Sequence, residues 1–142
     1  MGRTYRELLA VALLCGIALT GCSSSEAKPA APSPSVSPPV TGTVEQIAAH
    51  LGCKPEIHTD AEQLREGRCG TGANVFSVTT FPAEKYKQAW LYEAGGWGGW
   101  YVVGPGWTVS ASTKEAAVSR QKKLGGSLVD GSKVQKGTPP AT

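Results

Sequence analysis

Two histidines and two cysteines near the middle of the chain are the residue types of a zinc site. They are His50, Cys53, His58 and Cys69, spaced as His-x2-Cys-x4-His-x10-Cys. Imidazole nitrogen and thiolate sulfur are the ligands of tetrahedral zinc, so this spacing could close such a site. The alternative is a disulfide between Cys53 and Cys69. Disulfides persist in oxidising compartments, so the choice depends on where the chain resides.

Hydrolytic chemistry has weaker support. His58 and Asp60 are close in sequence and serines are plentiful, but the chain has no Gly-x-Ser-x-Gly elbow and no His-Glu-x-x-His. The Gly-Gly-Trp-Gly-Gly-Trp run at 95–100 lacks the Lys-Ser/Thr of a phosphate loop. We therefore predict a protein without enzymatic activity, with no catalytic residues, no bound metal and no cofactor. A small exported enzyme acting on the cell wall, or a metal-binding protein, remains the alternative.

Aromatic residues form the one unusual cluster. Six of them fall within 18 positions: Trp90, Tyr92, Trp97, Trp100, Tyr101 and Trp107. A tryptophan between glycine pairs, as at Trp97, is poorly placed for a core and well suited to contact a sugar ring or a partner protein. We expect a binding region made of Trp97, Trp100, Tyr101 and Trp107. The alternative is that Trp90 and Trp107 fill the core and that Trp100 pairs across a hairpin.

The N-terminus carries the pattern of an export signal. Residues 1–7 hold two arginines and one acid, and residues 8–20 are almost wholly apolar. An apolar helix of this length is too short to span a bilayer, and small residues follow it, as at a cleavage site. The segment ends in Leu19-Thr20-Gly21-Cys22. The thiol of Cys22 is a soft nucleophile suited to forming a thioether.

Leu19-Thr20-Gly21-Cys22 resembles the lipobox of bacterial lipoproteins. The resemblance implies that residues 1–21 are removed as a signal peptide and that Cys22 becomes a lipidated N-terminus carrying fatty acyl chains such as palmitate. Each buried methylene adds about 0.8 kcal/mol of membrane affinity, so two chains anchor stably. The resemblance thus places the protein on the extracytoplasmic face of the cell membrane. An exported pair of thiols is expected to be oxidised, which favours the Cys53–Cys69 disulfide over zinc.

Charge excludes one class of partner. The whole chain has a net charge of +3, and Lys122-Lys123 is its longest basic run in the exported part. We therefore expect no nucleic-acid partner. The expected partners are the membrane, through Cys22, and either an envelope protein or a cell-wall glycan.

Composition divides the exported part into three. Residues 22–42 form a lipidated start and a spacer rich in Pro, Ser and Ala, which cannot bury a core and favours extended backbone. Residues 43–130 should form a single folded domain. Residues 131–142 should be a flexible tail.

Local signals predict the elements of that domain. Thr43 and Gln46 fit a capping box for a first helix that ends near Gly52. Two hairpins follow, one over residues 67–80 and one over residues 98–111 with a Gly-Pro-Gly turn, separated by a helix over residues 82–94. Ser112-Thr113-Lys114-Glu115 fits a capping box, led by Ser112, for a third helix that ends before a glycine pair, and residues 127–129 could add a short strand. Residues 54–64 give no clear pattern.

These elements predict an α+β domain. We expect a small antiparallel sheet of about four strands, in two hairpins, with about three helices packed on one face and one disulfide. The combination is similar to small exported lipoproteins of actinobacteria. The features that carry this likeness are the Cys53/Cys69 pair, the Phe-Pro step before a helix with Trp90, the Gly-Pro-Gly-Trp turn ending at Trp107, and a closing Leu-Gly-Gly at 124–126. The likeness implies a type of domain and no chemistry.

Overall fold

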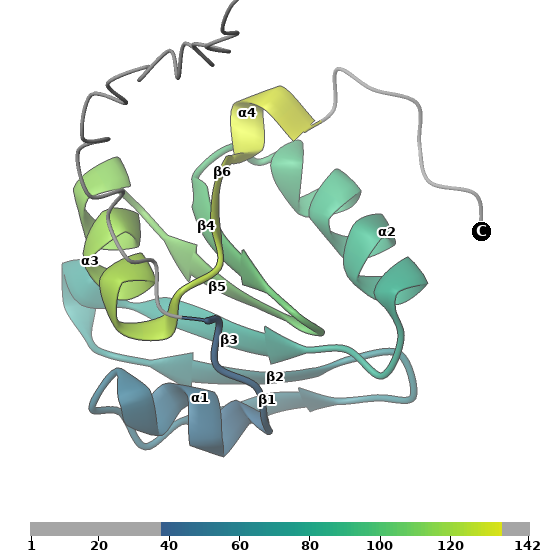
Figure 1. The fold of residues 1–142 in the computed structure, drawn as a ribbon, viewed down its shortest axis with the longest axis horizontal. Coiled ribbons are helices and arrows are strands. Elements are labelled where there is room, and N and C mark those ends of the chain that lie inside the picture. The colour runs from purple at the N-terminus through teal and green to yellow at the C-terminus, as the bar shows by residue number, and fades with distance from the viewer. Residues whose placement is uncertain (1–37, 135–142) are drawn as a thin grey trace, which may run out of the picture. The chain divides into compact units, whose positions relative to one another are not determined.

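A six-stranded antiparallel sheet organises the chain (Figure 1). The computed structural model describes residues 38–134, so the expected signal peptide, Cys22, most of the expected spacer and the last eight residues lie outside the described part. The strand order is β1-β2-β3-β5-β4-β6. The strands are β1 Glu56–Asp60, β2 Arg65–Cys69, β3 Phe76–Thr80, β4 Trp100–Gly104, β5 Trp107–Ala111 and β6 Ser127–Asp130.

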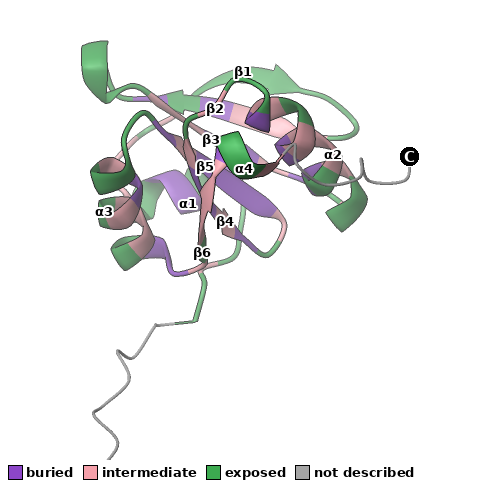
Figure 2. Cartoon of the chain, turned by 90° about the horizontal axis from the view of Figure 1, so that it is seen from above, coloured by how far each residue is buried: buried purple, intermediate pink, exposed green. Residues whose placement is uncertain are grey.

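The prediction of about four strands falls two short: the possible strand at 127–129 does form, as β6, whereas β1 was not expected. The inner four form the two expected hairpins, β2–β3 and β4–β5, joined by the pairing of β3 with β5. Strand β6 adds to β4 at one edge and β1 adds to β2 at the other. All five residues of β1 are exposed, as Figure 2 shows in green. With no buried face, β1 has no apolar alternation to recognise in the sequence.

Helix α1, Val44–His50, begins where its capping box predicts. The amide of Gln46 donates to the Thr43 hydroxyl, and the Gln46 side chain accepts from the Thr43 amide at 2.9 Å. These bonds satisfy two of the free amides at the helix start. Val44, Ile47 and Ala48 are buried on one face.

One face of the sheet holds the main core, beneath α1 and α3 (Lys114–Leu124). Its members are fully or almost fully buried: Val44, Ile47, Ala48, Cys69, Val78, Val102, Trp107, Val109, Ala111, Ala117 and Leu124. Trp107 is the largest of them. Its ring fills the space beside Gly104, where an added Cβ would lie 2.1 Å from a ring carbon. The Gly-Pro-Gly turn therefore needs its first glycine for packing.

The start of the described chain is fastened to this core. The amide of Val40 donates to the Leu124 carbonyl at 2.9 Å. In return, the indole N–H of Trp107 donates to the Val40 carbonyl at 2.7 Å. The buried indole thus finds the hydrogen-bond partner that such a group requires.

Helix α2, Glu84–Gly95, packs on the opposite face, which corrects the expectation that all helices share one face. Successive strand residues point to opposite sides of a sheet. Val102 lies in the main core, so Tyr101 points the other way, and its ring meets Trp90 of α2 edge-on at 5.7 Å. Trp90 also contacts Phe81 at 5.8 Å. Figure 1 shows α2 separated from α1 and α3 by the strands.

The C-terminal part differs from the sequence-based expectation in two details. The cap of α3 is Thr113, whose hydroxyl accepts from the Ala116 amide at 3.2 Å, and not Ser112. Residues 131–134, expected to start a flexible tail, form a short helix, α4 Gly131–Val134. The Asp130 carboxylate holds its first turn by accepting from the Ser132 amide and hydroxyl, at 3.1 and 2.7 Å. No helix among residues 38–134 is long and apolar enough to cross a membrane.

Candidate functional site

The four residues expected to bind a partner lie in very different environments. Trp107 is 0% exposed, and Tyr101 is 7% exposed. Trp100 is partly buried against the main core, with the ammonium of Lys114 over its ring at 5.4 Å. Trp97 is 92% exposed. Trp107 therefore belongs to the core, as the alternative interpretation held, and its side chain cannot contact a partner.

Tyr101 supports the loop that carries Trp97. Its hydroxyl lies 3.1 Å from the Ala94 carbonyl and 3.0 Å from the Gly98 carbonyl, which bracket the end of α2. Burial of the phenol raises the pKa of Tyr101. Tyr101 is thus a buried donor that positions backbone, and not a surface aromatic.

We call residues 96–99 the Trp97 loop. Its backbone is held by a series of hydrogen bonds even though its tryptophan is exposed. The amides of Gly96, Trp97 and Gly98 each donate at 3.0 Å to a carbonyl three residues earlier. The Gly99 carbonyl accepts from the Gly131 amide of α4 at 2.9 Å. The loop therefore has a defined backbone with an unburied indole at its tip.

Helix α4 packs closely against this loop and against the end of α2. A Cβ added at Gly131 would lie 2.6 Å from the Gly98 carbonyl oxygen, and one added at Gly95 would lie 2.8 Å from Val134. The contact thus requires glycine on both sides. Gly98 and Gly99 have φ of 74° and 84°, which glycine adopts readily and other residues rarely do. The glycines around Trp97 shape a fixed support for the indole.

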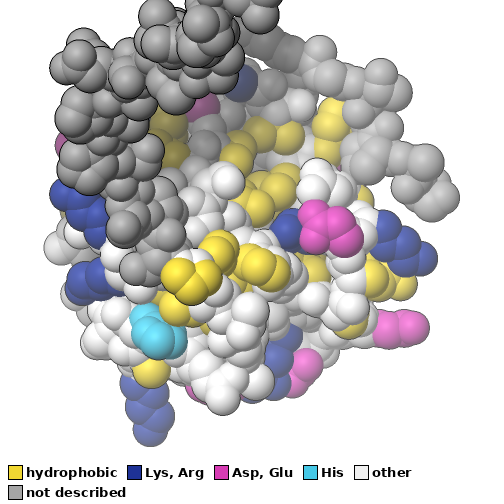
Figure 3. Space-filling view, viewed as in Figure 1, with side chains coloured by type: hydrophobic (Ala, Val, Ile, Leu, Met, Phe, Trp, Pro, Cys, Tyr) yellow, Lys and Arg dark blue, Asp and Glu magenta, His cyan; other side chains and the backbone are white. Residues whose placement is uncertain are grey.

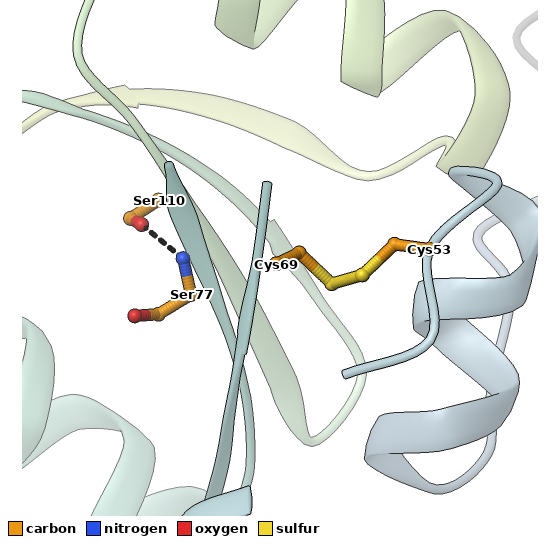
Figure 4. The surroundings of a disulfide bond; sticks show 4 residues. All are labelled: Cys53, Cys69, Ser77 and Ser110. Carbon is orange, nitrogen blue, oxygen red and sulfur yellow. Dashed lines mark hydrogen bonds between the residues drawn. A yellow bond between two sulfur atoms is a disulfide. The ribbon is translucent and has the colours of Figure 1, made fainter. Parts of the chain in front are cut away.

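The Cys53–Cys69 disulfide is confirmed, with Cα atoms 6.0 Å apart. It ties the segment after α1 to strand β2 (Figure 4). Nearby, the pairing of β3 with β5 ends, and the Ser77 amide donates instead to the Ser110 hydroxyl at 2.8 Å. Because both sulfur atoms are used in the disulfide, the zinc set with His50 and His58 is not assembled. The described residues contain no group of three or more His, Cys, Asp or Glu able to hold a metal.

No hydrogen bond or ion pair joins the two residues of the alternative hydrolase, His58 and Asp60, in the described part of the chain. His58 sits exposed at an irregularity between Ile57 and Thr59 in the β1–β2 pairing. The carboxylate of Asp60 accepts instead from Arg65, at 2.6 Å. Arg65 also pairs with Glu45, whose pKa is lowered by a hydrogen bond from its own amide and then by Arg65. Asp60 and Arg65 thus belong to an ion-pair network that links α1 to the sheet edge.

Arg120 is a polar residue with specific contacts that belongs to none of the motifs found in the sequence. It lies on α3 with its guanidinium carbon 4.1 Å from the centre of the Phe76 ring. It also donates to the Ser110 carbonyl at 3.0 Å. Ser110 and Arg120 lie on consecutive elements, β5 and α3, whereas Phe76 comes from β3, so no local pattern could have joined all three.

Comparisons with protein-family models, with curated proteins and with solved structures found no match to this chain. A function for this chain must therefore be inferred from its own residues and from the distances between them.

Proposed function

We propose that this chain is a lipid-anchored binding module of the cell envelope, without enzymatic activity, that contacts its partner through Trp97. Cys22 would hold it on the extracytoplasmic face of the cell membrane, and the Pro-rich spacer would carry the domain away from the lipid. The partner is an envelope protein or a cell-wall glycan.

The observation that carries this proposal is the exposure of Trp97 on a supported loop. A large aromatic side chain gains free energy when it is buried, and it loses little conformational entropy because it has only two rotatable bonds. Tyrosine and tryptophan are accordingly enriched among the residues that dominate binding energies. The hydrogen bonds from α2, α4 and Tyr101 reduce the ordering cost further, because they fix the backbone before any partner arrives.

The test is site-specific photo-crosslinking on intact cells. A photoreactive phenylalanine derivative replaces Trp97 in the full chain, and in a matched control it replaces Ile57. Ile57 is also an exposed apolar residue, but it lies on the edge strand β1. We expect position 97 to give one recurrent adduct that position 57 does not give.

The nature of the adduct then identifies the partner. A protein adduct would make the chain an accessory subunit, and a glycan adduct would make the wall its ligand. Identical patterns from positions 97 and 57, or no adduct at position 97, would overturn the assignment of Trp97.

The anchor is tested separately by metabolic labelling with a palmitate analogue. We expect the full chain to be labelled and to sediment with membranes. Cys22→Ser should abolish the label, whereas Cys53→Ser should keep it. A labelled Cys22→Ser chain would refute the anchor and leave the Trp97 experiment unaffected.

A further inference from the structure

A pocket of about 530 Å³ lies beside the Cys53–Cys69 disulfide. It is on the face of the sheet covered by α1 and α3. It is bounded by the segment after α1, by the turn between β2 and β3, and by one side of α3. We call it the Arg120 pocket. The lining residues that matter here are Cys53, Lys54, Phe76, Ser119, Arg120 and Lys123.

The charges around this pocket have one sign. Lys54, Arg120 and Lys123 line it, and no carboxylate does. Within residues 38–134, none of these three cations forms a salt bridge. Figure 3 shows Lys and Arg side chains along the left of the view, where Figure 1 places α3. Three like charges around one hollow repel one another, so an anion placed between them would be favoured.

Arg120 is held in place before any ligand arrives. Its guanidinium stacks on Phe76 at 4.1 Å and donates to the Ser110 carbonyl at 3.0 Å. Partial burial lowers the pKa of Arg120, and no carboxylate forms a salt bridge with it among the described residues. A guanidinium has five N–H donors in a planar fork, and a single carbonyl leaves most of them unused. Such a fork fits the oxygens of a phosphate group.

The walls of the pocket are tied together covalently and by hydrogen bonds. The disulfide holds the segment containing Lys54 to strand β2. The Ser77–Ser110 bond holds β3 to β5 where their regular pairing ends, and it is the carbonyl of this same Ser110 that accepts from Arg120. These bonds hold the backbone segment that carries Lys54 and the helix that carries Arg120 to the same part of the sheet.

We propose that the Arg120 pocket binds a phosphate group, carried by a soluble phosphate ester or by a lipid headgroup. Arg120 supplies the planar fork, and Lys54 and Lys123 supply point charges. The hydroxyl of Ser119 adds a neutral donor at the rim. This site does not depend on Trp97 or on the lipid anchor.

The experiment is calorimetric titration of the full chain in a neutral detergent. The soluble probe is glycerol 3-phosphate, and glycerol is its uncharged counterpart. The lipid probe is phosphatidylglycerol dispersed in the same detergent, and phosphatidylcholine, whose phosphate is offset by a cation, is its counterpart. We expect saturable binding of a phosphate probe that weakens as salt is raised. Saturation by glycerol 3-phosphate identifies a soluble ester, and saturation only by phosphatidylglycerol identifies a headgroup.

Matched variants assign the binding to the pocket. Arg120→Gln should weaken binding about tenfold or more, because a charged, forked donor is lost. Lys123→Gln should weaken it about threefold or more. Lys122→Gln removes the same charge from the preceding residue, which is exposed like Lys123 but lines a different hollow, and should change affinity less than about twofold.

A second variant covers the case in which Arg120→Gln does not fold. Arg120→Lys keeps the charge and a donor for the Ser110 carbonyl but loses the fork, so it should fold and bind several-fold more weakly. Equal losses from Lys122→Gln and Lys123→Gln would overturn the proposal, because binding would then follow net charge alone. So would unchanged affinity in Arg120→Lys and Lys123→Gln together, or no saturable binding of either phosphate probe.

Discussion

The two faces of the sheet bury different kinds of side chain. The face covered by α1 and α3 buries apolar side chains, whereas the face covered by α2 also buries three polar ones. The first face holds Val44, Ile47 and Trp107 with no exposed surface. The α2 face holds Thr79, Thr108 and the stem of Lys87, whose ammonium donates to the Gly104 carbonyl at 2.8 Å. Thr79 and Thr108 are assigned to this face because their neighbours Val78 and Val109 point into the main core.

The difference suggests that one face of the sheet stabilises the fold and the other positions the Trp97 loop. Burial of apolar area is the dominant favourable contribution to folding, so the α1/α3 face should set the stability of the domain. The α2 face is organised by directional contacts, namely the Lys87 bond, the Tyr101 hydroxyl and the Trp90 ring contacts. That face also carries the Trp97 loop. A binding residue placed there can change without disturbing the main core.

The largest expected effect comes from the tryptophan of the main core. Trp107→Ala should lower the free energy of unfolding by about 3–5 kcal/mol, because it leaves a cavity and frees the Val40 carbonyl. Trp97→Ala is the control and should change it by less than about 0.5 kcal/mol, since its ring is 92% exposed. Urea denaturation followed by circular dichroism measures both. Equal losses from the two variants would abolish the proposed division between the faces.

The disulfide on the same side should come next. Replacing both Cys53 and Cys69 by serine should cost about 2–4 kcal/mol, because the bridge restricts the unfolded chain. Treatment of the parent chain with a reductant should lower its free energy of unfolding, measured by urea denaturation, by the same amount. The free energy of unfolding of the double variant should not change on reduction. A parent chain whose midpoint does not respond to reduction would show that the bridge adds no stability.

A smaller, pH-dependent effect is expected on the α2 face from Tyr101. Tyr101→Phe removes the donor to the Ala94 and Gly98 carbonyls, which should cost about 1 kcal/mol at neutral pH. Burial raises the pKa of Tyr101, so folding favours the protonated phenol. The stability that it contributes is complete below the ordinary tyrosine pKa of about 10 and is lost as the pH rises through the folded value.

The deficit of Tyr101→Phe relative to the parent should therefore narrow between neutral pH and pH about 11. Denaturant titrations at both pH values measure this. Tyr86→Phe, on the same face, is the control and should decline with the parent at alkaline pH. A constant deficit for Tyr101→Phe would contradict the role of burial.

The smallest effect, and one of opposite sign, is expected at a buried hydroxyl. Thr108 Oγ1 has no hydrogen-bond partner among the described residues, whereas the Thr79 hydroxyl donates to Glu66 at 3.1 Å. Thr108→Val should leave stability unchanged or raise it by up to about 1 kcal/mol, because a buried unpaired polar group is removed. Thr79→Val should lower it by about 1 kcal/mol. Thermal unfolding of the pair decides the point, and a loss in Thr108→Val would indicate a bound water.

Features set by neighbouring residues could be predicted from the sequence. The capping box at Thr43, the Gly-Pro-Gly turn before Trp107 and the exposure of Trp97 between glycines depend on a few adjacent positions. The disulfide followed from an even pair of cysteines in a chain expected to be exported.

Features set by distant contacts could not be predicted. Strand β1 is exposed on both sides, so its sequence does not show the alternation of apolar and polar residues that predicts a strand. An apolar stripe shows that α2 must pack on something, but it does not show which face of the sheet. The Arg120 pocket depends on Phe76, Ser110 and Arg120 meeting across the fold, and that meeting is a property of strand order.

The fastening of Val40 has a mechanical consequence. If the chain is tethered at its N-terminal side, tension from the tether enters the domain at this residue. It is resisted first by the bonds of Val40 to Leu124 and Trp107, which lie ahead of α1 in the chain. A pull is thus passed to Trp107 and Leu124 of the main core before it can reach α1. The same indole that fills the core would then also resist the force applied through the tether.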